Sequence, residues 1–189
     1  MLGGGQVARA VAAAASSRHQ VVTRTRVELD IVDEGAVTRT LAEIEPDWVV
    51  NAAAYTAVDL AEDQVEEAYA VNDIAVASIA RASLHEGCRL LHLSTDFVFD
   101  GKSSRAYSPT ADANPLSVYG ASKLAGERHV LASGVSGIIL RTSWVYAAAG
   151  KNFVLTMLRL MRERDQINVV SDQIGTPTWA ASVGAAIGG

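Results

Sequence analysis

The sequence of 189 residues predicts an α/β fold with a doubly wound parallel sheet. Short apolar runs alternate with longer helical patterns, which is typical of βαβ units. The apolar runs are nearly continuous in Val, Ile and Leu, as expected of strands that are covered on both faces. A glycine-rich turn, Gly3-Gly4-Gly5, also stands directly before a helical pattern. Together these observations indicate a Rossmann-type fold.

The predicted strands and helices follow one another in regular order along the chain. Strands are expected at residues 20–23, Trp48–Asn51, 89–94, Gly137–Thr142 and 167–170. Helices are expected at residues 6–16, Glu34–Ile44, 65–86, 116–132 and 153–164. The helix at 116–132 carries a start signal, because Asn114 offers a capping side chain and Pro115 suits the first turn. No internal repeat or long linker interrupts the alternation.

The two ends depart from a complete fold of this type. Such a fold begins with a central strand that leads into the glycine turn, whereas only Met1-Leu2 precedes Gly3 here. Without that strand, its two neighbours in the sheet would have unpaired edges. The last residues, 179–189, have the pattern of a helix that stops early. We therefore expect a fold that lacks its first strand, in a chain that is a fragment or has a misplaced start.

Composition excludes several classes of protein. A formal net charge of −5 and a pI near 5.3 argue against a basic face for nucleic acid. Cys88 is the single cysteine, so an internal disulfide and a cysteine-cluster metal site are excluded, and the four histidines lack metal-ligand spacing. No basic leader precedes Arg9, and no apolar run approaches membrane-spanning length. We expect a soluble, cytoplasmic protein with no metal and no membrane contact.

Tyr119 and Lys123 are the first candidates for catalysis. Their i, i+4 spacing places both on one face of the helix predicted at 116–132. A phenol near an ammonium group ionises more easily, which suits an acid–base catalyst near neutral pH. Thr95 follows Ser94 at the tip of a predicted strand, where its hydroxyl can orient a carbonyl being reduced. Alone, Tyr-x-x-x-Lys is a weak pattern, and its weight comes from the features that agree with it.

The glycine turn is the candidate cofactor site. Gly3, Gly4 and Gly5 let backbone N–H groups approach a pyrophosphate, and the helix that begins at Gln6 and Val7 offers the positive end of its dipole. The fingerprint is incomplete, because Ala8 takes the place of its third glycine. A flexible glycine-rich terminus is the alternative interpretation.

Two arginines favour NADPH over NADH, although NADH remains an alternative. After the strand at 20–23, NAD-preferring folds place an acidic residue that holds the ribose 2′-hydroxyl. This chain has Arg24 and Arg26 there, and guanidinium groups suit a 2′-phosphate. Solvated surface arginines are the alternative. The expected walls of the site are Asp30 and Ile31 on the adenine side and Ala52, Ala53 and Ala54 on the nicotinamide side.

These residues together resemble the extended short-chain dehydrogenase/reductases, and within them the dTDP-4-dehydrorhamnose reductases. The matching segments cover nearly the whole chain in the order of that family. They are Asn51-Ala-Ala-Ala-Tyr-Thr-Ala-Val-Asp59, Ser94-Thr-Asp-Phe-Val-Phe-Asp-Gly101, Pro115-Leu-Ser-Val-Tyr-Gly-Ala-Ser-Lys123, Arg141-Thr-Ser-Trp-Val-Tyr146, Asn152-Phe153 and Asp172-Gln-Ile-Gly-Thr-Pro-Thr178.

The resemblance implies reduction of the 4-keto group of dTDP-4-dehydro-L-rhamnose by NAD(P)H, the last step of dTDP-L-rhamnose biosynthesis. Tyr119 would give a proton to the carbonyl oxygen, to which Thr95 would also hydrogen-bond. Lys123 would hold the nicotinamide ribose and lower the tyrosine pKa. The implied domains are an N-terminally incomplete NAD(P)-binding domain at 1–145 and part of a substrate-binding lobe at 146–189.

The resemblance also implies a set of residues on the substrate side. Trp144 would lie against the sugar ring, with ordinary core packing as its alternative. The residues around Gln173 would face the sugar nucleotide, with polar turn residues as theirs. The full expected set is Thr95, Asp96, Trp144, Asn152, Gln173 and Thr176.

The sequence leaves several functions besides reduction open. A 4,6-dehydratase needs a second carboxylic acid after Asp96, and Phe97 stands there instead. Epimerases keep their NAD bound through the cycle, whereas Arg24 and Arg26 favour an exchangeable NADPH. A non-catalytic role, as in the regulatory β subunit of methionine adenosyltransferase, would also fit the sequence, as would an inactive piece of a reductase. Exposed sheet edges would favour self-association, so a homodimer is left open.

Overall fold

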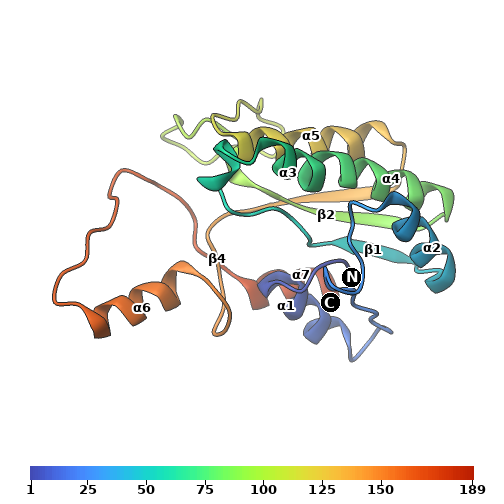
Figure 1. The fold of residues 1–189 in the computed structure, drawn as a ribbon, viewed down its shortest axis with the longest axis horizontal. Coiled ribbons are helices and arrows are strands. Elements are labelled where there is room, and N and C mark those ends of the chain that lie inside the picture. The colour runs from blue at the N-terminus through green and yellow to red at the C-terminus, as the bar shows by residue number, and fades with distance from the viewer. The chain divides into compact units, whose positions relative to one another are not determined.

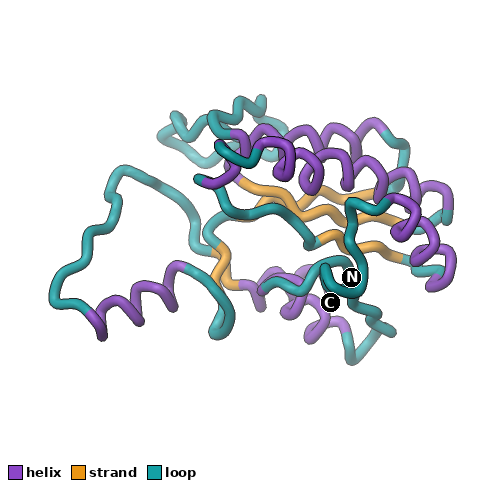
Figure 2. Tube along the Cα trace, viewed as in Figure 1, coloured by secondary structure: helices purple, strands orange, loops and turns teal.

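The computed structural model describes all 189 residues and divides into two compact units. Unit 1 comprises Met1–Gly4 and Thr23–Arg141, and unit 2 comprises Gly5–Val22 and Thr142–Gly189. Figure 1 labels the elements, and Figure 2 distinguishes helix, strand and loop. None of the helices has the length and apolar character needed to cross a membrane.

Unit 1 is built on a three-stranded sheet in the order β1 (Trp48–Asn51), β2 (Arg89–Thr95) and β3 (Gly137–Thr142). β1 and β2 are parallel, with Asn51 opposite His92. Met1–Gly3 lies in the place expected for the first strand of the fold. Leu2 bridges to Asn51 on one side and to Arg24 on the other, through backbone hydrogen bonds of 2.9 Å.

Helices of unit 1 form a layer over its sheet (Figure 1). α2 (Glu34–Ile44) packs on α4 (Ala75–His85), α4 packs on α5 (Val118–Ala132), and both α4 and α5 contact β2. The short helix α3 (Val65–Tyr69) leads through a π-helical turn, Ala70–Ile74, into α4. Two 3₁₀ turns, Leu60–Glu62 and Asp96–Val98, both contact α5. Apolar side chains between the layers form the core, including Val37, Leu41, Val49, Ile79 and Leu90.

Unit 2 contains a helix pair and a minimal sheet. α1 (Gln6–Ala15) packs along α7 (Ala180–Gly188), and the two helices approach closely because Gly184 has no side chain: a Cβ there would lie 2.5 Å from the Ala10 carbonyl oxygen. β4 (Val145–Tyr146) and β5 (Thr178–Trp179) are parallel. Along the chain, β4 and β5 are separated by α6 (Phe153–Glu163), which has no buried residue.

Several predicted elements are confirmed to the residue, namely Glu34–Ile44, Trp48–Asn51 and Gly137–Thr142. Two predicted strands are wrong. The segment 20–23 is irregular, and only Arg24 makes a bridge, because Met1–Gly3 offers it a single pairing position. The segment 167–170 has no partner strand, and Val169 and Val170 are exposed there.

Helix boundaries differ in two further places. The helix expected at 65–86 is divided by the π-helical turn. α5 begins at Val118, two residues later than expected, and its N-cap is Ser117, whose hydroxyl accepts the N–H of Gly120 at 3.1 Å. Asn114 is not the cap: its backbone N–H donates to the carbonyl of Val98 at 2.9 Å.

Candidate active site

The end of β2 and the start of α5 are held together by short-range contacts. Thr95 is the last residue of β2, and its hydroxyl accepts the N–H of Phe97 at 3.2 Å. Gly120 lies directly against the Phe97 carbonyl, where any side chain would collide with the backbone. The ring of Tyr119 packs edge-on against Phe97, with 5.5 Å between centroids. This packing brings Tyr119 to Thr95.

Tyr119 and Thr95 are joined by a side-chain hydrogen bond, so two of the residues expected to act together are neighbours. Burial raises the pKa of Tyr119, and the charge of Asp96 raises it further, while the bond to Thr95 partly lowers it. The direction is opposite to the lowering expected from a neighbouring lysine, because burial dominates. At neutral pH the phenol therefore keeps its proton and can donate it.

Lys123, one turn further along α5, is almost fully buried. Its Nζ donates to the Leu93 carbonyl at 2.7 Å and lies 3.4 Å from Nε2 of His92. Burial lowers the pKa of Lys123 to about 8, and the charge of Glu127 opposes that shift. In this arrangement the amine is bonded to the end of β2.

A set of buried polar side chains supports α5. The amide of Asn72 accepts the N–H of Tyr55 at 3.0 Å and donates to the Tyr55 carbonyl and the Ser122 hydroxyl, each at 3.1 Å. Glu127 accepts two hydrogen bonds from Arg141, at 2.9 and 2.6 Å. Sequence reasoning did not single out these residues or His92. A polar residue inside the apolar run 89–94 was the available signal.

Most of the expected cofactor residues lie in unit 1. Gly3 has φ +109°, and a Cβ there would lie 3.0 Å from the backbone of Ala52 and Ala53, so this position requires glycine. Arg24 is half-buried and its guanidinium lies 3.4 Å from the Thr23 carbonyl. The remaining expected residues in this unit are exposed Gly4, half-buried Ala54, exposed Asp30, which accepts the N–H of Val32, and Ile31, which belongs to the core.

The other expected cofactor residues begin α1 in unit 2. Gly5 is the N-cap of α1, no side chain caps the helix, and a Cβ at Gly5 would meet nothing within 4 Å. Gln6 donates to the Lys151 carbonyl at 3.1 Å, and Val7 is half-buried. The first N–H groups of α1 thus have no side-chain acceptor, which suits an anion.

The expected substrate residues are divided between the units. Thr95 and Asp96 adjoin Tyr119 in unit 1, whereas the others lie in unit 2. Trp144 has φ +46°, is 44% exposed, and its ring lies over Gly175. Gln173 and Thr176 flank that glycine on an exposed segment. Asn152 is the N-cap of α6, accepting the N–H of Leu155 at 3.0 Å and donating to Gln6 and the Ala147 carbonyl.

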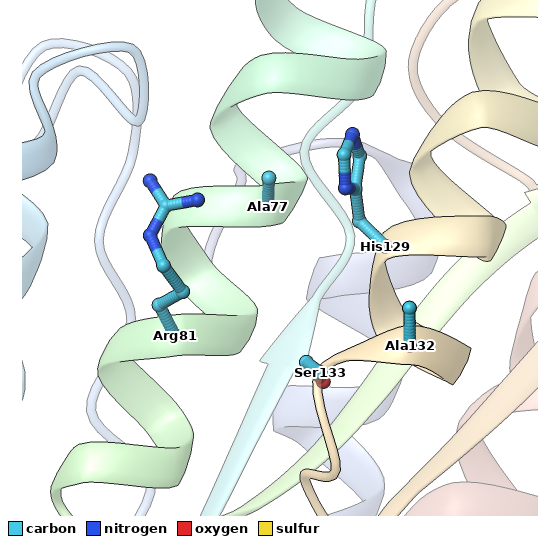
Figure 3. Close-up of a pocket in the computed structure, with 5 residues that line it drawn as sticks. All are labelled: Ala77, Arg81, His129, Ala132 and Ser133. Atoms are coloured by element: carbon cyan, nitrogen blue, oxygen red, sulfur yellow. The ribbon is translucent and has the colours of Figure 1, made fainter.

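A separate hollow between α4 and α5 contains none of the predicted site residues. It is lined by Ala77, Arg81, His129, Ala132 and Ser133, with the side chains of Arg81 and His129 on opposite sides (Figure 3). Both of these side chains have acidic partners, Glu34 for Arg81 and Asp73 for His129, each at 2.8 Å. No group of three or more His, Cys, Asp or Glu side chains is arranged to hold a metal ion.

Comparison with known proteins gives concordant matches. The family model described as RmlD substrate binding domain matches residues 1–188. The chain is 46% identical over 179 residues to a dTDP-4-dehydrorhamnose reductase of Burkholderia thailandensis, covering 95% of this chain and 60% of that protein. It is 43% identical over 186 residues to the one of Aggregatibacter actinomycetemcomitans, covering 97% of this chain and 63% of that protein. The chain thus spans about three fifths of the length of these curated relatives.

Solved structures agree with these matches. The chain is similar to the crystal structure of dTDP-4-dehydrorhamnose reductase from Bacillus anthracis in complex with NADP, with a TM-score of 0.95 and 38% identity. It is also similar to that of the Clostridium acetobutylicum reductase, with a TM-score of 0.94 and 36% identity. In each case 98% of this chain and 67% of the solved chain are covered. These matches confirm the predicted Rossmann-like fold with its parallel sheet. The chain belongs to the family of the RmlD substrate binding domain.

Proposed function

We propose that this chain carries the reducing centre of a dTDP-4-dehydrorhamnose reductase, which acts in the last step of dTDP-rhamnose biosynthesis. The reaction is the reduction of the 4-keto group of dTDP-4-dehydro-L-rhamnose to dTDP-L-rhamnose. One observation carries the proposal: the hydrogen bond between Thr95 and Tyr119, with Lys123 one turn along the same helix. Relatives with this name at 43–46% identity support it.

Tyr119 is the proposed proton donor. Its raised pKa keeps the phenol protonated at neutral pH, so it can give a proton to the carbonyl oxygen as that oxygen gains negative charge. Thr95 lies within hydrogen-bonding distance of Tyr119, and its hydroxyl would have to turn from Asp96, to which it donates at 3.2 Å, to bind the same oxygen. Lys123 would bind the nicotinamide ribose after leaving Leu93.

NADPH is the proposed cofactor, with NADH as the alternative, and when bound it supplies the hydride. The residues of the glycine turn fit its pyrophosphate, because Gly5 leaves open space at the uncapped start of α1. Arg24 and Arg26 would bind a 2′-phosphate. The NADP complex of the Bacillus anthracis relative supports this choice. The full proposed set is Gly3, Gly4, Gly5, Gln6, Val7, Arg24, Asp30, Ile31, Ala52, Ala53, Ala54, Tyr119 and Lys123.

The proposed substrate side comprises Asp96 with Thr95, and Trp144, Gln173 and Thr176 from unit 2. Trp144 offers a half-exposed aromatic face to a sugar ring. Asn152 would reach the substrate only by giving up a bond to Gln6 or to Ala147.

Three further predictions accompany this function. Residues 1–145 would form the NAD(P)-binding domain and residues 146–189 part of the substrate-binding region. The protein would be cytoplasmic, where nucleotide sugars are made. A homodimer, bound to the sugar nucleotide and to neither nucleic acid nor membrane, is the proposed assembly.

The direct test follows the loss of NADPH absorbance with enzymatically prepared dTDP-4-dehydro-L-rhamnose. Tyr119→Phe should lower turnover ~100-fold or more and leave NADPH binding nearly intact, since it removes only the proton donor. Tyr107→Phe is the matched control, because that hydroxyl is bonded to Asp100 at 2.8 Å, away from Thr95. Unchanged turnover in Tyr119→Phe would contradict the assigned role. A folded chain without substrate-dependent NADPH oxidation would contradict reduction by this chain.

A further inference from the structure

Two polar side chains face each other inside the sheet of unit 1. Asn51 ends β1 and stands opposite His92 of β2, and both are completely buried. Nδ2 of Asn51 lies 3.2 Å from Nδ1 of His92. On its other side, Nε2 of His92 lies 3.4 Å from Nζ of Lys123. Neither Asn51 nor His92 has a part in the proposed reaction.

The backbone of Ala53 fixes the orientation of the Asn51 amide. A backbone N–H can only donate, and that of Ala53 lies 3.1 Å from Oδ1 of Asn51, which therefore accepts. The amide nitrogen then points at Nδ1 of His92. Since an amide nitrogen can only donate, Nδ1 must be the acceptor.

His92 is consequently restricted to one neutral tautomer. Burial, and then the charge of Lys123, keep the pKa of His92 well below 6.5, so the ring carries a single proton. Because Nδ1 accepts, that proton is on Nε2. The ring thus presents an N–H to Lys123.

An N–H group facing Lys123 discriminates between the two forms of its amine. An ammonium has three donors and no acceptor, so it would oppose the Nε2–H of His92. An uncharged amine has a lone pair that accepts this N–H while one of its own hydrogens goes to the Leu93 carbonyl at 2.7 Å. Only the uncharged amine satisfies every member of the series from Ala53 through Asn51, His92 and Lys123 to Leu93.

We propose that His92 is a positioning residue for Lys123: held by Asn51 with its proton on Nε2, it favours the uncharged amine over the ammonium while that amine rests on Leu93. The relevance to turnover rests on the proposed function, in which Lys123 binds the nicotinamide ribose. Above pH 8, where the resting amine is uncharged, Lys123 takes up a proton from solvent when it leaves Leu93, so cofactor binding in that pH range is accompanied by proton uptake.

Other ionisable groups lie near Lys123, on its own helix and on β2. On its own helix, Tyr119 lies one turn before it and Glu127 one turn after it. The carboxylate of Glu127 favours the ammonium, but it is paired with Arg141 of β3. His92 is the group that β2 presents to the amine. Burial of Lys123 outweighs the charge of Glu127, and the resulting pKa is about 8.

Magnetic resonance of the full chain, labelled in histidine and lysine, tests this proposal without substrate or turnover. The chain has four histidines and three lysines, so the signals are few. We expect His92 to show an unprotonated Nδ1 and a protonated Nε2 about one unit above pH 8, where Lys123 is uncharged, and the lysine signal that disappears in Lys123→Arg to titrate near pH 8. A proton on Nδ1, or a Lys123 that titrates with the other two lysines, would overturn the proposal.

Asn51→Asp should invert the tautomer. Its carboxylate can accept both the Ala53 N–H and a proton placed on Nδ1, so Nε2 becomes an acceptor for the ammonium, and Lys123 should titrate at least about one pH unit higher. His92→Gln, whose amide oxygen can face Lys123, should act in the same direction. Asn114→Asp, which adds a charge without contacting His92, is the control and should leave the titration in place. If the titration of Lys123 stays in place in both Asn51→Asp and His92→Gln, His92 has only a packing role, whatever the reductase assay gives.

Discussion

The two units of this protein hold their polar side chains in different ways. In unit 1, Asn72, His92, Lys123 and Glu127 are each at most 2% exposed, and each has a hydrogen-bond partner. In unit 2, α6 has no buried residue, and its apolar Met161 is 63% exposed. The residues proposed for chemistry, such as Lys123, therefore lie among residues that stabilise unit 1. No residue between positions 143 and 179 is buried, so replacing a side chain there should generally cost the fold less.

The largest difference is expected between two Arg–Glu pairs. Glu127→Ala in unit 1 leaves Arg141 without its bidentate partner and should lower the free energy of unfolding by about 3–5 kcal/mol. Glu163→Ala in α6 breaks an exposed pair with Arg159 and should change it by no more than about 0.5 kcal/mol. Urea denaturation measures both. Equal losses would contradict the contrast between the units.

Two glycines give an intermediate effect. A Cβ at Gly126 would collide with the backbone carbonyl of Asn72, so Gly126→Ala should cost about 1–3 kcal/mol by forcing α5 away from the π-helical turn. A Cβ at Gly175 would meet only the half-exposed ring of Trp144, which can turn aside, so Gly175→Ala should cost less than about 1 kcal/mol. Thermal unfolding gives the comparison, and tryptophan fluorescence should change only in Gly175→Ala. A larger loss of stability in Gly175→Ala than in Gly126→Ala would contradict the view that unit 1 is the more rigidly packed of the two.

Acid sensitivity should show the smallest effect. Because the folded-state pKa of His92 lies well below 6.5, the unfolded chain binds a proton there before the folded chain does. Stability contributed by this residue is thus present above pH 6.5 and is lost as the pH falls, by about 1.4 kcal/mol per unit. His92→Gln should remove that part of the slope in unfolding experiments between pH 6.5 and 5.5. Exposed His19→Gln in unit 2 is the control, and an unaltered slope in His92→Gln would disprove the assignment.

Local sequence patterns predicted much of the fold, whereas pairings between distant segments could not be predicted from them. Periodicity and apolar runs were sufficient for Glu34–Ile44 and Trp48–Asn51 because each element is encoded within its own residues. The run at 167–170 has the right composition for a strand, but a strand also requires a neighbour with free hydrogen-bonding groups.

The candidate site divides in the same way. The nearness of Thr95 and Tyr119 could be predicted from a strand tip and one helix face, although their direct hydrogen bond was not. The direction of the Tyr119 pKa was wrong because depth of burial depends on the whole fold. The pairing of Asn51 with His92 depends on strand register, which spacing along the chain does not contain.

The Asn51–His92 pair also bears on how the sheet assembles. Side chains alternate between the faces of a strand, so a slip of β2 by one residue would turn His92 to the other face and bury an apolar side chain opposite Asn51. The amide nitrogen of Asn51 and Nδ1 of His92 would then lose their shared hydrogen bond, at a cost of about 1–3 kcal/mol for each buried group left unpaired. The flanking apolar residues of β2 could tolerate such a slip, since one leucine resembles another. The pair therefore favours the native register of β1 and β2 over a register shifted by one residue.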